Sequence, residues 1–343
     1  MAKILVIRFS AIGDVAMTVP VIHSLATQYP QHQITVLSRP NMAPLFAHLP
    51  SNVSFIGADL KNTYRGFIGL NRLFDELKAG KFDYIADFHD VLRTKYLRFR
   101  FWLQRKKVAH IDKGRKGKKA LTRTKNKIKV QQDTSFQRYA NVLNRIGLPT
   151  KIGFQSIYPQ GKADTSSFLS VTGTKGSDKW IGIAPFATHS GKIYPTEQME
   201  EVIRQLDAMS GVRLFLFGGG KKEIEILSAW ANRYPSATCI AGKLKMNAEL
   251  ALMSHLEVMV SMDSGNMHLA SLVNTPVVSI WGATHPLAGF MGWSQSEENA
   301  VQADLPCRPC SVYGNKPCMR GDYACLHGIA PDEVVRRIHR VIG

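Results

Sequence analysis

The residues that most clearly suggest chemistry lie in the stretch VSMDSGNMHLASLVNTPVVSIWGATHP, residues 260–286. After an apolar, strand-like run, Asp263, Ser264 and Gly265 open a helical stretch. The free amides and positive end of such a helix bind anions, and glycine allows a phosphate to approach the backbone closely. His268 follows one turn later, on about the same face as Ser264. The pattern predicts a phosphate site; the alternatives are simple helix capping and a structural histidine.

Two further loops follow strand-like runs in this half of the chain. PFATHSGKIYP offers the hydroxyl of Thr188 and the ammonium group of Lys192, which suit a diphosphate. FGGGKKE offers Gly218, where the backbone can be approached closely, and Glu223, whose carboxylate can accept hydrogen bonds from ribose hydroxyls. Three such loops at one sheet edge predict a site for a nucleoside diphosphate.

The stretch RFSAIGDVAMTVP, residues 8–20, follows the first apolar run and occupies the position of a phosphate loop. It has one glycine, Gly13, instead of the three of a dinucleotide fingerprint, and the acid Asp14 follows it. Because a carboxylate repels phosphate, Asp14 does not fit a phosphate-binding role at this position. The alternative for Asp14 is a helix cap without a chemical role.

Positive charge is concentrated in one window of the chain. The net charge is +18, and residues 93–129 hold sixteen Lys and Arg against the single acid Asp112. A local field of this size predicts an anionic partner: nucleic acid, an anionic membrane surface or a phosphorylated substrate. The alternative is a solvated loop. Residues 113–129 have the composition of a mobile loop that docks on a membrane or binds phosphate groups.

Four of the five cysteines form the pattern C-x2-C-x7-C-x6-C near the C-terminus. Such a set can hold a structural zinc ion, although the second and third spacings are long for a zinc knuckle. Free thiols and disulfides are the alternatives, and disulfides are disfavoured because no secretion signal precedes them. The four are Cys307, Cys310, Cys318 and Cys325.

These residues need a framework, and the pattern of the chain predicts one. Short β-branched runs alternate with amphipathic stretches, which is typical of parallel sheets covered by helices. Helical stretches include 15–28 and 331–342, and the strands expected in the second half are 180–184, 213–217, 238–240, 257–261 and 277–281. The alternation stops in a stretch rich in Gly, Ser, Thr and Lys and then restarts, so we expect two doubly wound units. The expected parts are a first domain over residues 1–160, a linker over 161–178, a second domain over 179–328 and a closing helix over 329–343, which could pack back on the first domain.

Bulk composition agrees with this class. The 343 residues suffice for two domains, and 45% hydrophobic and 20% charged residues are typical of a globular protein. No apolar run approaches the roughly 20 residues that span a bilayer. The N-terminus does not have the pattern of a signal peptide, so we expect a cytoplasmic protein with peripheral membrane contact.

The chain resembles glycosyltransferase family nine, the ADP-heptose:lipopolysaccharide heptosyltransferases. The resemblance runs in order through KILVIRFSAIGDV, DYIADFHDVLRTK, PFATHSGKIYP, LFGGGKKE, MDSGNMHLASLVNTPVVSIWGATHP and CLHGIAPDEVVRRI. It implies an α/β protein with the GT-B fold: two Rossmann-like, doubly wound parallel-sheet domains with an interdomain cleft. It also implies an inverting, metal-independent transfer of heptose from ADP-heptose to the phosphorylated Kdo–lipid A inner core of lipopolysaccharide.

The resemblance also implies roles for single residues. Asp14 matches the family's proposed catalytic base. The residues that match the donor site are Thr188, Lys192, Gly218, Glu223, Asp263, Ser264, Gly265 and His268, with Leu244 near the adenine. On the acceptor side we expect the first loop and the basic window to contribute Ser10, Gly13, Arg93, Lys95, Arg98, Lys113, Arg115 and Lys116.

Several alternatives stay open at this stage. The chain could use another nucleotide sugar or glycan acceptor, or be a non-catalytic homologue that binds a sugar nucleotide or an anion. A nucleic-acid-binding protein would account for the charge but not for the Asp-Ser-Gly-x-x-His element. A dehydrogenase lacks its GxGxxG fingerprint here. We therefore expect a monomer that meets a nucleotide-sugar donor, a phosphorylated lipid A/Kdo acceptor and the anionic face of the inner membrane, and no nucleic acid.

Overall fold

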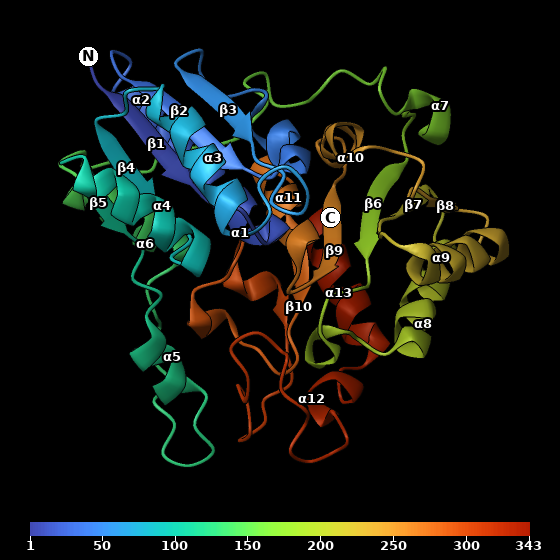
Figure 1. Ribbon diagram of the computed structural model, residues 1–343. Coiled ribbons are helices and arrows are strands. Elements are labelled where there is room, and N and C mark those ends of the chain that lie inside the picture. The colour runs from blue at the N-terminus through green and yellow to red at the C-terminus, as the bar shows by residue number, and fades with distance from the viewer. The chain divides into compact units, whose positions relative to one another are not determined.

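A computed structural model describes all 343 residues, and the chain divides into two compact units (Figure 1). Unit 1 comprises residues 1–113 and 133–157, and unit 2 comprises residues 114–132 and 158–343. Each unit is built on its own parallel sheet, as expected. No helix of the chain is long and apolar enough to cross a bilayer.

Unit 1 contains a five-stranded parallel sheet in the order β3-β2-β1-β4-β5. The central strand β1 is apolar after its first residue, Lys3, and its residues 4–7 are fully buried, as expected for a strand covered on both faces. The strands are β1 (Lys3–Ile7), β2 (Gln33–Ser38), β3 (Val53–Gly57), β4 (Tyr84–Asp87) and β5 (Lys107–His110).

Two groups of helices cover this sheet. The helices α3 and α4 lie side by side and share a core with β1, while α2 and α6 pack against each other. The helices of unit 1 are α1 (Ile12–Ala16), α2 (Val19–Gln28), α3 (Gly66–Lys78), α4 (Leu92–Leu103) and α6 (Ser135–Arg145), with the 3-10 helix η1 (Pro40–Phe46). The sequence predicted a single helix over 15–28, but the structure has α1 and α2 with a break before Val19 and Pro20.

Unit 2 contains a six-stranded parallel sheet in the order β11-β10-β9-β6-β7-β8. The strands are β6 (Lys179–Ala184), β7 (Val212–Leu216), β8 (Ala237–Cys239), β9 (Val258–Met262), β10 (Val277–Ile280) and β11 (Ala300–Val301). The first five were predicted within one or two residues at each end. The two-residue edge strand β11 was not predicted, because so short a run has no periodicity.

The helices of unit 2 cover its sheet from both faces. Its larger core joins alternate residues of the strands to α8, α9 and α13, and α11 packs on β9 and β10. The α-helices are α5 (Arg115–Leu121), α7 (Leu169–Thr172), α8 (Thr196–Asp207), α9 (Lys221–Arg233), α10 (Met246–Met253), α11 (Gly265–Leu272), α12 (Ala324–His327) and α13 (Pro331–Ile342). Three 3-10 helices complete the unit: η2 (Ser190–Lys192), η3 (Pro286–Ala288) and η4 (Glu297–Asn299).

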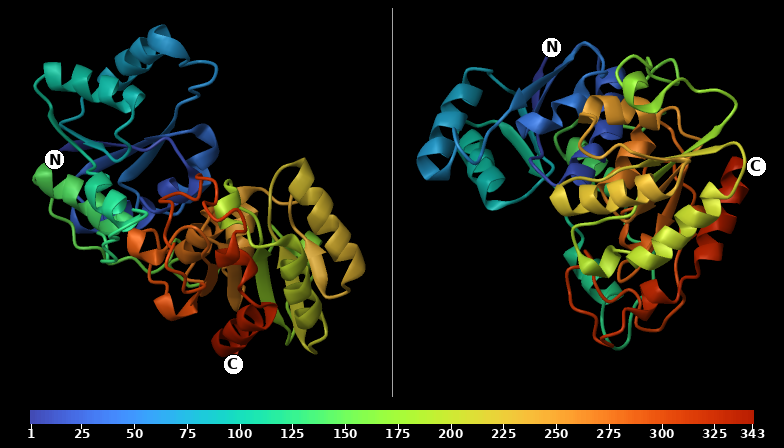
Figure 2. Two further views of the ribbon diagram at one scale, coloured as in Figure 1. Left: turned by 90° about the horizontal axis from the view of Figure 1, so that it is seen from below. Right: turned by 90° about the vertical axis from the view of Figure 1, so that its right-hand side faces the viewer.

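The domain boundaries differ from the expectation in two places. The closing helix α13 is part of unit 2: Val334 and Ile338 are buried in its core, beside α8 (Figure 2). The expected linker, residues 161–178, also belongs to unit 2, where Phe168 is fully buried with its ring 6.3 Å from that of Trp180. Both differences have the same cause: these two segments carry apolar side chains, and unit 2 buries them in its interior.

The basic segment 114–132 is the third difference, since it groups with unit 2 and is not a free loop. Lys118 is buried, with its ammonium nitrogen 4.1 Å from the ring centre of Phe290. Lys127 Nζ donates to the carbonyl of Pro309 at 2.6 Å, and Gln132 N donates to the carbonyl of Leu287 at 2.9 Å. These contacts give the segment a defined place, which its composition did not predict.

Candidate functional site

Each parallel sheet has one point where the strand order reverses, and ligands of such sheets bind beyond the strand ends at that point. In unit 1 this point lies between β1 and β4, and in unit 2 it lies between β6 and β9. The loops that follow these strands carry Asp14, His89, Lys192 and Asp263. The topology therefore selects, independently of any motif, three residues that the sequence had singled out.

Asp14 lies in the first turn of α1, and its side chain is 34% exposed. Its Oδ2 atom lies 2.6 Å from Nη2 of Arg8 and accepts a hydrogen bond from the amide of Ala11 at 3.2 Å. Oδ1 makes no hydrogen bond within the protein and remains available to a ligand. The capping interaction that we considered as an alternative thus exists, and it leaves one carboxylate oxygen for chemistry.

Arg8 is a fixed charge beneath Asp14. Its guanidinium group is buried and donates from Nη1 to the carbonyl of Phe88 at 2.7 Å. Burial acts to lower the pKa of Arg8, but attraction from Tyr139 and Asp14 outweighs it and leaves the pKa above its ordinary value. The guanidinium group therefore keeps its proton at every working pH and orients the carboxylate.

A second set of polar groups lies at the end of β4. The buried Asp87 accepts hydrogen bonds at Oδ1 from the amides of His89 and Asp90, both at 2.9 Å. His89 Nδ1 accepts the amide hydrogen of Phe9 at 3.4 Å, which places the ring proton on Nε2. Burial, with the nearby charge of Arg8, lowers the pKa of His89 to about 3, so the ring is neutral near pH 7.

The predicted acceptor residues are divided between the two units. Arg98 is engaged by carboxylates, at 3.0 Å from Asp87 Oδ2 and 3.3 Å from Asp90 Oδ1. Lys113 Nζ donates to the carbonyl of Asp90 at 3.0 Å, and Lys95 lies 3.9 Å from the same aspartate.

The remaining acceptor candidates have fewer partners. Arg93 is exposed at the start of α4, and Arg115 and Lys116 are exposed on α5 in unit 2. Ser10 is half-buried in the loop after β1, and Gly13 lies inside α1 and not in the turn before it. The acceptor role of all eight residues stays a prediction.

In unit 2, Lys192 and Asp263 form the central pair. Lys192 Nζ lies 2.8 Å from Asp263 Oδ2, and both side chains are largely shielded from solvent. Asp263 does not cap α11 but holds this lysine, which connects the loop after β6 to the loop after β9. A diphosphate that bound here would compete with Asp263 for the ammonium group.

The loop that carries Lys192 is packed so closely that only glycine fits at position 191. A Cβ atom on Gly191 would lie 2.7 Å from the carbonyl oxygen of Gly314, and Gly191 itself accepts a hydrogen bond from the amide of Ala283 at 2.8 Å. Thr188 is exposed in the same loop. The position of Lys192 therefore depends on residues that lie 92 and 123 positions beyond Gly191 in the chain.

The start of α11 has the properties expected of an anion site. Ser264 is the N-cap residue, but its side chain makes no capping bond, and its Oγ lies 3.2 Å from Oγ of Ser261. Gly265 begins the helix, and His268 is buried one turn later. The first amides of α11 are thus not satisfied by a side-chain cap, so helix capping alone does not account for the motif.

In the glycine loop after β7, a backbone amide is already bonded to the carboxylate of Glu223. Glu223 Oε2 accepts the amide hydrogen of Gly219 at 2.8 Å, and a Cβ atom on Gly218 would lie 2.8 Å from Leu227. Leu244 is half-buried just before α10. In the first turn of α10, burial raises the pKa of Glu249 to about 7, a feature that the sequence did not indicate.

Arg308 is a positioning residue that sequence reasoning missed. It is buried and donates to the carbonyl oxygens of Gly282 at 2.6 Å, Trp281 at 3.1 Å and Thr284 at 3.0 Å. These carbonyls belong to the loop after β10. Nothing local in the sequence around Arg308 indicates those partners, because they lie more than 20 residues away.

The four C-terminal cysteines are free thiols, and no group of three or more His, Cys, Asp or Glu side chains is arranged to hold a metal ion. The structural zinc ion that the spacing allowed therefore has no assembled set of ligands here. Burial raises the pKa of Cys325 to about 11, and burial with Cys307 raises that of Cys310. Both thiols stay protonated near neutral pH.

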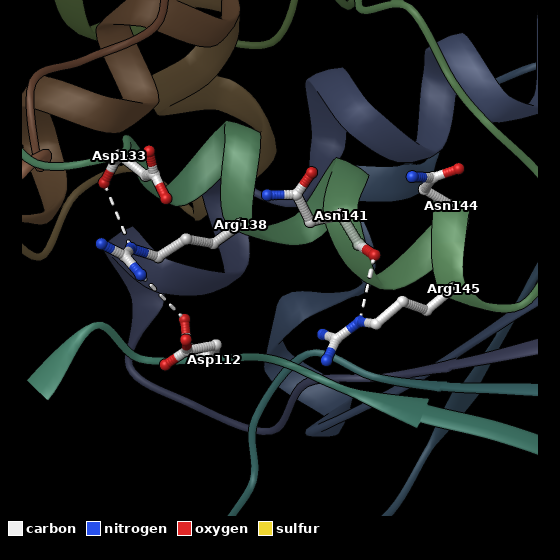
Figure 3. A pocket seen from close by; sticks show the side chains of 6 residues that line it. All are labelled: Asp112, Asp133, Arg138, Asn141, Asn144 and Arg145. Carbon is white, nitrogen blue, oxygen red and sulfur yellow. Dashed lines mark hydrogen bonds between the residues drawn. The ribbon is translucent and has the colours of Figure 1, made fainter.

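A polar pocket of about 300 Å³ lies on unit 1 beside α6 (Figure 3). Arg138 is buried and donates to the carbonyls of Asp133 and Asp112, both at 3.1 Å. It thereby ties together the two ends of the 114–132 segment. The pocket is also lined by Asn141, Asn144 and Arg145, none of which the sequence had suggested.

Two parallel-sheet units, each with polar loops at its switch point and one with a helix start that lacks a side-chain cap, define a two-domain α/β protein of the GT-B class. The chain belongs to the family described as Glycosyltransferase family 9 (heptosyltransferase), which matches residues 70–318. It is therefore a glycosyltransferase.

Individual relatives agree with this assignment. Lipopolysaccharide heptosyltransferase 3 of Escherichia coli is 25% identical over 299 residues, covering 84% of this chain and 85% of the relative. A family 9 glycosyltransferase from Veillonella parvula has the same fold, with a TM-score of 0.76, 19% identity and coverage of 99% and 97%. The E. coli heptosyltransferase WaaC with ADP superposes with a TM-score of 0.70, 18% identity and 99% coverage of both chains.

Proposed function

We propose that the protein transfers heptose from ADP-heptose to the phosphorylated Kdo inner core of lipopolysaccharide. The observation that carries the donor half is the pair Lys192–Asp263 beside the uncapped start of α11. A cation, hydroxyls and free helix amides at one switch point suit a diphosphate. Relatives named as lipopolysaccharide heptosyltransferases support the choice of sugar and acceptor.

Asp14 acts as the general base in this proposal. Its Oδ1 atom takes the proton of an acceptor hydroxyl while that oxygen attacks the anomeric carbon of the donor. The new glycosidic bond forms on the face opposite the diphosphate, and the bond between the anomeric carbon and the diphosphate oxygen breaks. One such displacement inverts the anomeric configuration. Arg8 positions the carboxylate for this step and does not touch the substrate.

The leaving diphosphate is stabilised by groups of the chain itself. Its growing negative charge meets Lys192, the hydroxyl of Thr188 and the amides at Ser264 and Gly265. Preorganised charge of this kind can take the place of a metal ion. We therefore propose metal-independent transfer by a monomer at the cytoplasmic face of the inner membrane, with the acceptor's phosphates met by basic residues such as Arg93.

A thermal-shift screen tests the donor assignment. ADP and ADP-heptose raise the melting temperature by mass action if they bind the folded chain. UDP and UDP-sugars leave it unchanged, because the proposal restricts the donor to adenine nucleotides. Equal stabilisation by UDP-sugars would favour the alternative of a transferase with another nucleotide sugar.

A further inference from the structure

We infer that the outward face of α3 and α4 is the surface by which unit 1 binds an anionic lipid bilayer. Twelve large hydrophobic side chains of the protein are exposed, and six of them lie on these two helices. We call this set the α3–α4 apolar face. Its members are Phe67, Ile68, Leu92, Phe99, Trp102 and Leu103.

The geometry of α4 brings four of these residues to one side. The helix buries Thr94, Leu97 and Phe101 against the sheet. Leu92, Phe99 and Leu103 follow a spacing of seven and four residues, so they form a line along the opposite side, with Trp102 next to it. The rings of Phe99 and Trp102 stack at 6.0 Å. An outward-facing line of this kind is the reverse of the polar surface that a helix of a globular protein presents to water.

The start of α3 extends the same surface. The ring of Phe67 contacts that of Tyr96 on α4 at 5.2 Å, edge to face. Ile68 and Leu92 are each 85% exposed, and Phe67 is 67% exposed, so neither helix is covered by the rest of the chain here. The two helices lie side by side in both views of Figure 2. Six exposed apolar side chains on two neighbouring helices point to a binding face.

The charges around the face select its partner. Basic residues flank it, and the sequence from Val91 to Ile111 contains no acid, while α3 carries the exposed acids Asp75 and Glu76 in its second half. Tryptophan and phenylalanine enter the boundary between headgroups and acyl chains, while lysine and arginine reach the anionic headgroups. A second copy of the chain would place like charges opposite each other, which disfavours self-association. The exposed basic residues are Arg65, Arg93, Lys95 and Arg105, and Lys106 beside them is half-buried.

The inference rests on the proposed function, because membrane binding is useful to a transferase whose acceptor is linked to a lipid in the membrane. Leu92 is two residues from Asp90, in the loop at the switch point of unit 1. Docking through α4 would hold that loop near the headgroups. The basic segment 114–132, which the sequence suggested for this task, instead has partners in unit 2.

Vesicle co-sedimentation of the full chain tests the inference. We expect binding to vesicles of phosphatidylglycerol and phosphatidylethanolamine and little binding to phosphatidylcholine alone. The double variant Phe99→Glu/Trp102→Glu should bind the anionic vesicles at least about tenfold more weakly, because it removes two large apolar anchors. Replacing Arg65 and Lys106 by Gln should weaken binding about fivefold per residue and reduce its salt dependence.

A matched control is provided by Ile128 and Val130, which are 50% and 53% exposed but lie in segment 114–132. The variant Ile128→Glu/Val130→Glu should bind vesicles as the wild type does. Unchanged binding of the Phe99→Glu/Trp102→Glu variant would overturn the inference. So would a change of its oligomeric mass in light scattering, which would assign the face to contact between copies.

Two further measurements separate this result from other failures. Circular dichroism and the melting temperature should not change in the Phe99→Glu/Trp102→Glu variant, because both side chains are exposed. The melting shift caused by ADP should also persist, since it depends on unit 2. Loss of the ADP shift in the wild type contradicts the proposed function, whereas loss of vesicle binding in the wild type contradicts only the docking surface.

Discussion

At the scale of single residues, the pair formed by Asp14 and Arg8 determines what the first unit can do. The 2.6 Å contact uses Oδ2 and leaves Oδ1 for a substrate proton. A carboxylate held by a buried guanidinium group has its position fixed before the reaction begins. This arrangement suits a general base that removes the proton of the acceptor hydroxyl, because that hydroxyl becomes acidic only as the glycosidic bond forms.

Replacing Asp14 by Ala should lower kcat by about 10²–10⁴-fold, the usual contribution of a general base, and leave ADP affinity unchanged. Asp14→Asn is the matched variant, because its amide oxygen can still accept the hydrogen bond from Ala11 but cannot take a proton. Steady-state kinetics and ADP titration measure both effects. Retention of more than about a tenth of wild-type turnover by either variant would rule out Asp14 as the base.

His89 should make stability depend on pH. The folded pKa of about 3 lies below the unfolded value of 6.5, so the unfolded chain binds a proton first as the pH falls. The stabilisation is complete above about pH 6.5 and is lost as the pH falls toward 3, by about 2 kcal/mol at pH 5. Urea unfolding at pH 7.5 and pH 5 should show a smaller loss for His89→Gln than for the wild type. Equal losses would show that His89 is not the titrating group.

At the scale of elements, the donor loops are positioned by long-range packing. Gly191→Ala would place a Cβ atom 2.7 Å from the carbonyl oxygen of Gly314 and 3.0 Å from Cβ of Ala283. Overpacking of this kind costs about 1–3 kcal/mol, so we expect lower unfolding free energy and weaker ADP binding. The control Gly176→Ala meets nothing within 4 Å and should behave as the wild type in both assays. If both variants behave alike, the loop is not held by this contact.

Several elements could be predicted from the sequence because their patterns are local. The helix over residues 331–342 was expected with the bounds that α13 has, since Pro331 marks its start and its apolar residues follow a helical spacing. The helix α4 was not predicted. Its apolar residues occupy both its inward and its outward side, so it lacks the one-sided period that identifies a helix.

The sequence predicted which loops form the candidate site, but not the residues that hold those loops in place. Motifs at strand ends located Asp14, Lys192 and Asp263, because parallel strands bring their carboxyl ends to one edge. The partners that hold these residues were not predictable, since Arg308 reaches carbonyls more than 20 residues away. Arg8 lies in the same motif as Asp14, but the sequence did not indicate that the two side chains form an ion pair.

At the scale of the whole molecule, charge is divided between two different structures. The basic window of residues 93–129 appears as one run in the sequence, but its first part belongs to unit 1 and its last part packs on unit 2. Lys118 and Lys127 are tied to Phe290 and Pro309, while the exposed members nearest the α3–α4 apolar face remain available to an anionic surface. A run of basic residues in the sequence therefore predicts attraction to anions, but it does not predict which surface of the folded protein binds them.

The central claim is that this chain transfers heptose from ADP-heptose to the Kdo inner core. The most direct measurement follows ADP release and product mass with ADP-heptose and a Kdo–lipid A acceptor. We predict ADP release that depends on the acceptor and a product heavier than the acceptor by one heptose unit. Absence of both with folded, ADP-binding protein, or equal turnover with a UDP-sugar, would contradict the claim.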